Sequence, residues 1–188
     1  MSVTINISRS LVRHLPHRLV LHRLALLLFF CAGTAGFSTP SQAKDPAFLA
    51  FGVGGYDVID SEEAAVEFRG EYRSAQEYFY LKPFGGAMVT TNGAADVYAG
   101  VLLDIYWGTR IVTTFSFAPS LYYDGEGKDL GHVVEFRSQF EVAYRFDDRS
   151  RVGISINHLS NAGLNDRNPG TETIALTYIV PFDRVWNW

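Results

Sequence analysis

The segment Val134-Glu-Phe-Arg-Ser-Gln-Phe-Glu-Val-Ala-Tyr-Arg-Phe146 alternates between two kinds of side chain. The even-numbered positions hold mostly apolar residues: Val134, Phe136, Ser138, Phe140, Val142, Tyr144 and Phe146. The odd-numbered positions between them hold glutamate, arginine, glutamine and alanine. A period of two is typical of a β-strand with one apolar and one polar face. The segment therefore predicts a strand whose second face is charged, with both signs present.

The same alternation extends over most of the chain after Ala43, where no window has a convincing helical period. Short turn signals such as Asn92-Gly93 and Gly108-Thr109 separate the alternating stretches. We expect eight strands, near residues 47–58, 62–73, 78–91, 94–107, 110–123, 131–146, 150–161 and 171–182.

Two architectures are compatible with this pattern. A soluble β-sandwich or lipocalin-like barrel turns its apolar face inward, whereas an outer-membrane barrel turns it toward lipid. The strands are long enough to span a bilayer at a tilt, their number is even, and the chain ends in Val-Trp-Asn-Trp188. These features favour an all-β fold, an eight-stranded antiparallel transmembrane β-barrel of the bacterial outer membrane.

The first 43 residues have the composition of a secretory signal peptide. Four arginines precede an apolar run from Leu24 to Phe30, and a small-residue cleavage site ends at Ala43. We therefore expect a signal peptide over residues 1–43 and the barrel over residues 44–188. The predicted mature chain has 12 basic and 20 acidic residues, a net charge of −8, which does not fit a nucleic-acid-binding surface. It also has no cysteine, because Cys31 lies in the leader.

Three polar residues fall on the lipid-facing parity of the last two predicted strands. Both termini of an even-stranded barrel lie on the periplasmic side, so the loop 162–170 is expected at the cell exterior. His158 and Ser160 share the parity of Ile154 and Ile156, and Glu172 shares that of Ile174 and Leu176. An antiparallel register can place His158 opposite Glu172, with Cβ atoms about 5 Å apart. A nucleophile, a base and an orienting carboxylate would then meet near the exterior end.

In a second interpretation, these residues lie at the membrane–water interface and have no catalytic role. The cost of a charged side chain on the lipid face falls to about 0–1 kcal/mol near the ends of a membrane barrel. The residues alone therefore leave the catalytic and interfacial interpretations open.

The segment His158-Leu-Ser-Asn-Ala-Gly163, followed by Asn168, Pro169, Gly170 and Glu172, resembles the signature of the PagL-type lipid A 3-O-deacylases. Members of this family are eight-stranded outer-membrane barrels whose active site faces the outer leaflet. Their pattern is His-x-Ser-Asn, an asparagine ten residues after the histidine and a glutamate fourteen after it, and Asn161, Asn168 and Glu172 match it.

The resemblance implies a role for each residue. Ser160 would be the nucleophile, His158 its general base, and Glu172 the group that orients the imidazole. Asn168, with the turn that begins at Asn161, would stabilise the oxyanion, although both asparagines also suit a purely turn-forming role. Proton transfer from Ser160 to His158 needs no metal ion, and we expect no cofactor.

The expected function is hydrolysis of the 3-O-linked acyl chain of lipid A, the membrane anchor of lipopolysaccharide, in the outer leaflet. The fatty chain would lie along Ile154, Ile156, Ile174 and Leu176. The alternatives are a non-catalytic structural barrel or narrow pore, and an outer-membrane phospholipase. The resemblance also suggests a homodimer.

Overall fold

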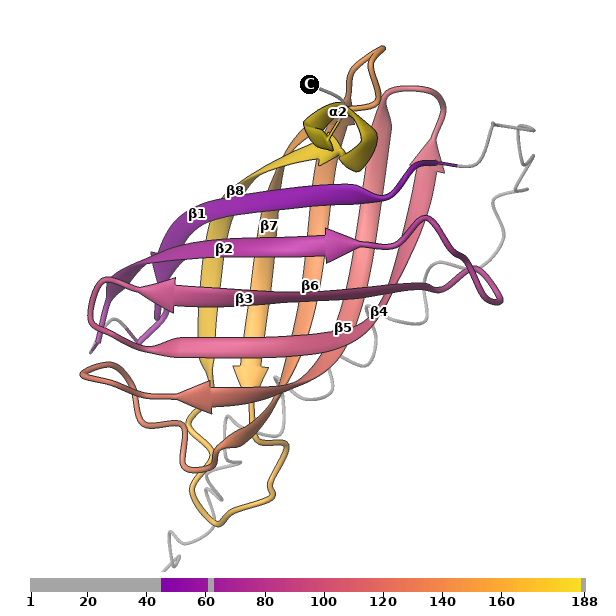
Figure 1. Ribbon diagram of the computed structural model, residues 1–188. Helices are drawn as coiled ribbons and strands as arrows, with labels where there is room; N and C mark the ends of the chain where they lie inside the picture. Colours follow the sequence, from indigo (N-terminus) through magenta and orange to yellow (C-terminus); the bar gives the residue numbers. More distant parts are fainter. Residues whose placement is uncertain (1–44, 61–62, 187–188) are drawn as a thin grey trace, which may run out of the picture. The chain divides into compact units, whose positions relative to one another are not determined.

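The computed structural model describes residues 45–60 and 63–186, which form a closed barrel of antiparallel strands (Figure 1). Each strand pairs with its neighbours in the chain, and β1 pairs with β8 to close the sheet. The strands are β1 (Phe48–Tyr56), β2 (Ala65–Arg73), β3 (Lys82–Thr90), β4 (Ala95–Trp107), β5 (Ile111–Tyr123), β6 (Val134–Arg145), β7 (Arg151–Ser160) and β8 (Thr171–Pro181). The predicted signal peptide, residues 1–43, lies outside the described residues.

The eight predicted strands are all present, and the largest difference in their bounds is at the start of β3. The alternation predicted a strand from residue 78, but β3 begins at Lys82. Tyr78 and Leu81 form a bridge around a two-residue turn in which Phe79 and Tyr80 have φ angles of 52° and 69°. Such turns usually contain Asn or Gly at these positions, so two aromatic residues gave no turn signal.

Apolar side chains cover the outside of the barrel and polar ones fill its inside. On β7, Ile154 and Ile156 are 55% and 51% exposed, whereas the intervening Ser155 is fully buried. The same alternation runs through β2, where Phe68 points outward and Arg69 inward. This is the reverse of a soluble barrel, so the apolar-outward architecture expected from the sequence is confirmed.

Charged side chains bridge the lumen from wall to wall. Arg73 on β2 donates two hydrogen bonds to Glu141 on β6, at 2.9 and 3.0 Å. Arg69, also on β2, donates to Ser155 on β7 at 2.9 Å. Because these partners lie on opposite walls, the ion pairs and hydrogen bonds cross-link the barrel from within.

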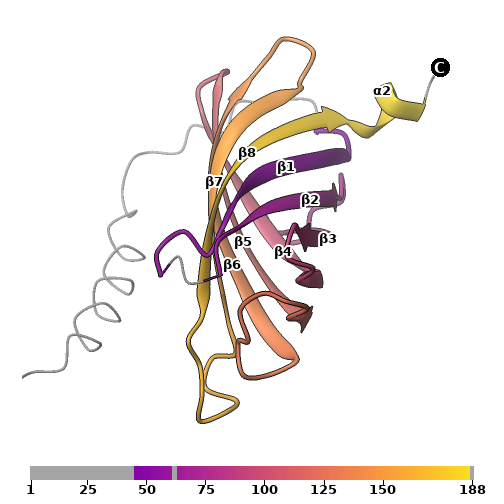
Figure 2. The ribbon, with the colours of Figure 1, turned by 90° about the vertical axis from the view of Figure 1, so that its left-hand side faces the viewer.

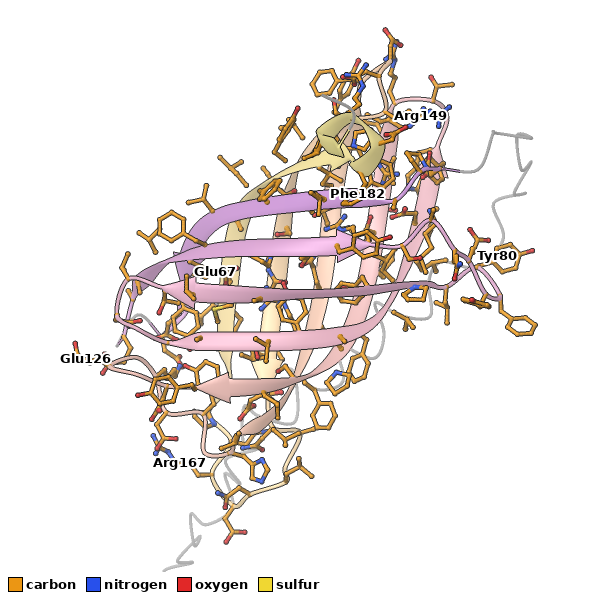
Figure 3. All side chains as sticks on the ribbon, viewed as in Figure 1. Glu67, Tyr80, Glu126, Arg149, Arg167 and Phe182 are labelled. Carbon is orange, nitrogen blue, oxygen red and sulfur yellow. The ribbon has the colours of Figure 1, made fainter. Side chains whose placement is uncertain are left out.

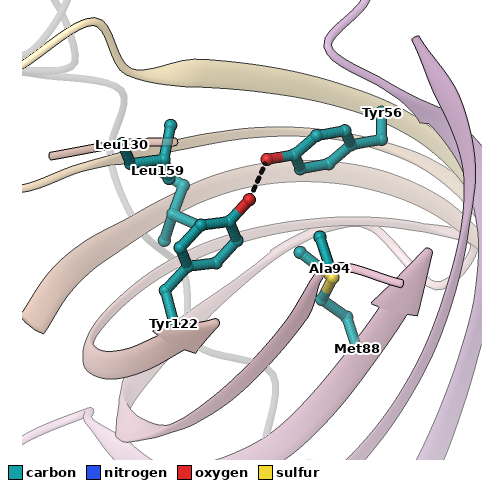
Figure 4. Packing of buried hydrophobic residues seen from close by; sticks show 6 residues of the cluster. All are labelled: Tyr56, Met88, Ala94, Tyr122, Leu130 and Leu159. Atoms are coloured by element: carbon teal, nitrogen blue, oxygen red, sulfur yellow. Dashed lines mark hydrogen bonds between the residues drawn. The ribbon is translucent and has the colours of Figure 1, made fainter. Parts of the chain in front are cut away.

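The two ends of the barrel differ. Segments 57–60, 63–64, 91–94, 124–133 and 161–170 lie between strands at one end, which we call the loop end. The chain termini of the barrel and segments 74–81, 108–110 and 146–150 lie at the other, the terminal end (Figure 2). At the loop end a cluster of buried side chains packs across the lumen, and within it the hydroxyl groups of Tyr56 and Tyr122 lie 2.7 Å apart (Figure 4). We call this cluster the cap: Tyr56, Met88, Ala94, Tyr122, Leu130 and Leu159.

A short helix, α2 (Phe182–Trp186), follows β8 at the terminal end. β8 ends at Pro181, as expected for a residue that cannot donate to a sheet. The ring of Phe182 packs edge-on against Tyr72 at a centroid distance of 5.8 Å, and its backbone N–H donates to the carbonyl of Ala47. Among the described residues, no helix is long and apolar enough to cross a membrane.

Candidate active site

His158 on β7 and Glu172 on β8 are directly opposed in the sheet, a register that the parity of the two strands allowed. Both side chains point outward, and His158 Nδ1 lies 3.0 Å from Glu172 Oε1. With Nδ1 donating to the carboxylate, the imidazole is in the tautomer that leaves Nε2 free to accept a proton. The side chains are 47% and 26% exposed, so the pair lies on the barrel surface and is open to a ligand.

Gly170 lets the imidazole lie close to the backbone of the β7–β8 connection. A Cβ atom at this position would be only 3.0 Å from His158 Cε1 and 3.6 Å from Nε2. Gly170 comes just before β8, on the loop-end side of Glu172. The free ring nitrogen is therefore directed toward the loop end, which is also where β7 carries Ser160.

Ser160 is the last residue of β7 and lies two positions beyond His158 on the same face. It is partly exposed and stands opposite Phe136 of β6. Its hydroxyl has no hydrogen-bond partner within residues 45–60 and 63–186. Hydrogen bonds between catalytic groups are often long before substrate binds. What relates Ser160 to His158 here is that both side chains lie on the same face of β7 and that the imidazole points toward the end of the strand that carries Ser160.

The two asparagines of the motif have different environments. Asn161 is fully buried, and its Nδ2 donates to the carbonyls of Leu130 and Arg167 at 2.9 and 2.8 Å. Its Oδ1 accepts the N–H of Gly163 at 2.9 Å. Both amide hydrogens of Asn161 are thus used within the loops, so its side chain has none left for an oxyanion. These contacts are those of a turn-forming residue, the second role considered from the sequence.

Asn168 is exposed and is the other candidate oxyanion donor. Its Oδ1 accepts the backbone N–H of Asn161 at 3.0 Å. This bond fixes the amide plane, and its Nδ2 makes no hydrogen bond to any residue that the structure describes. Asn168 can therefore donate to a ligand without giving up a contact.

The four residues predicted to contact the acyl chain form one apolar strip. Ile154 is paired with Leu176, and Ile156 with Ile174. All four are 47–61% exposed on the outer wall. The strip begins beside the His158–Glu172 pair and extends toward the terminal end.

An ion pair between two loops supports the start of β8. Lys128 Nζ lies 2.7 Å from Asp57 Oδ1, and the same oxygen accepts the hydroxyl of Thr171, the neighbour of Glu172. Burial alone would raise the pKa of Asp57, but the hydrogen bonds from Lys128, the backbone of Glu63 and Thr171, together with the charge of Lys128, outweigh it and hold the pKa below its ordinary value. Next to Asp57, Val58 donates its N–H to the carbonyl of Glu172 at 3.1 Å.

Asp57 and Lys128 were not predicted from the sequence, because nothing local indicates that two loop residues so far apart meet. Ser138 was missed too: β6 places it directly opposite His158 on the outer face. The signal was present, since it is the one hydroxyl-bearing aliphatic residue on the apolar parity of 134–146. Within residues 45–60 and 63–186, no cluster of three or more His, Cys, Asp or Glu residues is suited to hold a metal ion.

His158, Ser160 and Glu172 thus share the outer face of two adjacent strands, and Asn161 and Asn168 lie in the connection between those strands. A family model described as lipid A 3-O-deacylase (PagL) matches residues 57–181, most of the chain and all of this site. The chain belongs to the lipid A 3-O-deacylase (PagL) family. The lipid A deacylase PagL of Bordetella bronchiseptica is 28% identical over 75 residues, which are 40% of this chain and 38% of that protein. The chain thus matches well under half of the length of this curated relative.

Solved structures agree with the PagL-family fold. The crystal structure of the outer membrane enzyme PagL has a TM-score of 0.59 at 18% identity, covering 72% of this chain and 99% of that chain. Neisserial surface protein A has a TM-score of 0.53 at 9% identity, covering 72% of this chain and 96% of that chain. At such identities the likeness concerns the fold alone. It confirms the eight-stranded transmembrane barrel predicted from the sequence.

Proposed function

We propose that this protein is an outer-membrane esterase that hydrolyses the 3-O-linked acyl chain of lipid A. The observation that carries the proposal is the His158–Glu172 hydrogen bond on the lipid-facing wall, beside Ser160. A lipid ester is held within the membrane, so its hydrolase needs catalytic groups that face lipid. Membership of the PagL family supports the same substrate.

The chemistry follows from the positions of these groups. Ser160 Oγ attacks the ester carbonyl carbon while His158 Nε2 takes the serine proton. Asn168 Nδ2 donates to the oxyanion of the tetrahedral intermediate. The intermediate then expels the 3-oxygen of the sugar, which receives the proton from His158. Water, deprotonated by the same imidazole, hydrolyses the acyl-Ser160 ester and releases the fatty acid.

Glu172 serves this cycle by holding the ring. Its Oε1 fixes the Nδ1–H tautomer and stabilises the imidazolium formed when Ser160 loses its proton. The position of Glu172 is stabilised by its neighbour Thr171, whose hydroxyl donates a hydrogen bond to Asp57.

The proposed membrane orientation puts the loop end at the cell exterior. The termini of an even-stranded outer-membrane barrel lie in the periplasm, which assigns the terminal end to that side. His158, Ser160 and Glu172 then meet the outer leaflet near the boundary between headgroups and chains. The strip of Ile154, Ile156, Ile174 and Leu176 follows the acyl chain toward the middle of the membrane.

A narrow pore is disfavoured by the contents of the lumen. Arg73, Glu141 and Arg69 fill its middle, and the cap packs across the loop end (Figure 4). An eight-stranded barrel has room for little besides its own side chains.

The test is to identify the fatty acid that the purified protein releases in detergent micelles. Lipopolysaccharide and a glycerophospholipid are supplied in parallel, with Ser160→Ala as the blank, and products are identified by mass spectrometry. Release of the 3-O-linked chain from lipopolysaccharide alone supports the proposal. Release from the phospholipid instead indicates a phospholipase, and no release from either indicates a structural barrel.

A further inference from the structure

Ser138 of β6, His158 of β7 and Glu172 of β8 form a row across three adjacent strands. Ser138 is directly opposite His158, which is directly opposite Glu172. All three side chains face outward, in a row that runs perpendicular to the strands. Ser138 is therefore the direct register neighbour of His158 on one flank, as Glu172 is on the other.

Phenylalanines surround Ser138 on the lipid-facing wall. Phe136 and Phe140 are its neighbours on the same face of β6, and Phe117 stands opposite it on β5. Phe117 stacks on Phe136 at a centroid distance of 6.0 Å and an interplanar angle of 11°, and Phe115 packs against Phe140 at 5.0 Å. The β6 flank of the site is thus an aromatic surface with a single hydroxyl at its centre.

The protein itself makes no use of this hydroxyl. Ser138 is exposed, and none of the residues described in the structure hydrogen-bonds to its Oγ. The imidazole of His158 is turned the other way, with Nδ1 on Glu172 and Cε1 over Gly170. An exposed hydroxyl without a protein partner is free to donate a hydrogen bond to a ligand that reaches this wall.

We propose that Ser138 and the phenylalanines around it bind a second acyl chain of the lipid substrate, next to the chain that is cleaved. The proposal rests on the proposed function. Ser138 Oγ donates to the carbonyl oxygen of an ester or amide that is not hydrolysed, and Phe117 and Phe140 pack on its hydrocarbon tail.

Depth and direction support this assignment. In a glycolipid with several acyl chains, the carbonyl groups lie near the headgroup boundary, and the row puts Ser138 on the strand next to His158. The aliphatic strip on β7 and β8 receives the cleaved chain on one flank. The aromatic flank, on strands about 4.8 Å apart, is left for its neighbour. Site selection among several acyl chains then comes from binding two of them at once.

Kinetics on two substrates test the proposal. Loss of one neutral hydrogen bond of about 1 kcal/mol weakens binding roughly fivefold. Ser138→Ala should therefore raise KM for multiply acylated lipopolysaccharide about fivefold with kcat unchanged. KM for a single-chain p-nitrophenyl ester should stay the same, and Ser138→Thr should restore the lipopolysaccharide KM. Tyr144→Phe, which removes an outward hydroxyl from the same face of β6 farther along the strand, is the matched control.

Two results would overturn the proposal. An unchanged KM for lipopolysaccharide would leave Ser138 without a ligand, and loss of kcat on both substrates would make it part of the catalytic machinery instead. Binding of lipid A to Ser160→Ala and to the Ser160→Ala/Ser138→Ala double variant gives a readout without turnover. A weaker affinity of the double variant supports the subsite even if hydrolysis is absent, so failure of the subsite and failure of the proposed function remain distinguishable.

Discussion

Lys128 Nζ donates to Asp57 Oδ1 over 2.7 Å and joins the β1–β2 and β5–β6 connections at the loop end. Asp57 is fully buried and Lys128 is 7% exposed. A second carboxylate, Asp60, also lies 2.7 Å from the ammonium group, but its side chain is 53% exposed. The inner carboxylate is the one that contacts Thr171, so it links the loops to the strand that carries Glu172.

This ion pair predicts acid sensitivity. The pKa of Asp57 is lower in the folded protein than in the unfolded chain. Its contribution to stability is therefore complete above the unfolded value of about 3.9 and is lost as the pH falls through the folded value. We expect Asp57→Asn to be less stable than wild type at neutral pH, and to lose less stability between pH 7 and about pH 3. Urea unfolding across that range measures both, and Asp60→Asn, which changes the exposed acceptor, should resemble wild type.

Replacement of Ser160 or His158 by alanine should abolish ester hydrolysis while the barrel still folds. Both side chains point away from the lumen, so their loss removes no internal contact. Fatty-acid release from lipopolysaccharide measures activity, and circular dichroism with a thermal melt verifies folding. Near-full activity of folded Ser160→Ala would exclude this serine as the nucleophile.

Glu172→Gln should lower kcat strongly without affecting membrane insertion. Loss of the orienting carboxylate costs about 10⁴ in kcat in a comparable serine triad, and the amide can still occupy the space beside His158. The change keeps the volume of the side chain and removes its charge. An unchanged kcat would return Glu172 to the interfacial interpretation that the sequence left open.

Gly170→Ala should reduce kcat through displacement of the imidazole. The new Cβ atom would lie 3.0 Å from His158 Cε1, and the φ of +67° adds backbone strain. Gly163→Ala is the matched control, because Gly163 has a φ of +84° but nothing within 4 Å of an added Cβ. Both variants should lose a similar amount of stability, about 1 kcal/mol, but only Gly170→Ala should lose activity. Equal kcat values would separate Gly170 from the site.

Single cysteines test the sidedness of β7. The predicted mature chain has none of its own. Ile156→Cys should be shielded from water-soluble thiol reagents because it lies on the lipid-facing wall, 51% exposed in the isolated barrel. Asp166→Cys, in the β7–β8 connection, should react in intact cells. Labelling of both positions, or of neither, would contradict the orientation proposed for the barrel.

Local patterns were sufficient to predict the strands and the outward face shared by His158 and Glu172, since both depend on parity, which allows their direct pairing but does not fix the register. Parity also separated the acyl-chain strip from the lumen. Parity carries no information on contacts between loops. The Asp57–Lys128 ion pair and the burial of the Asn161 amide are therefore visible only in the structure. The turn at Phe79 was missed for another reason: aromatic residues have high strand propensity, which masked a tight turn with positive φ. Ser138 had a visible signal, but its significance depended on knowing which strand lies beside β7.

The cross-lumen bonds of Arg73 and Arg69 have an evolutionary consequence. The opposite walls of the barrel are held together by buried partners inside it, and removing one partner of a buried pair costs about 3–5 kcal/mol. The contacts that hold the opposite walls together are therefore concentrated on inward-facing side chains, whereas the outward-facing ones form the lipid-facing wall. Mutation of the outer wall therefore has little effect on folding, so the lipid-facing surface can diversify while the barrel is inherited almost unchanged.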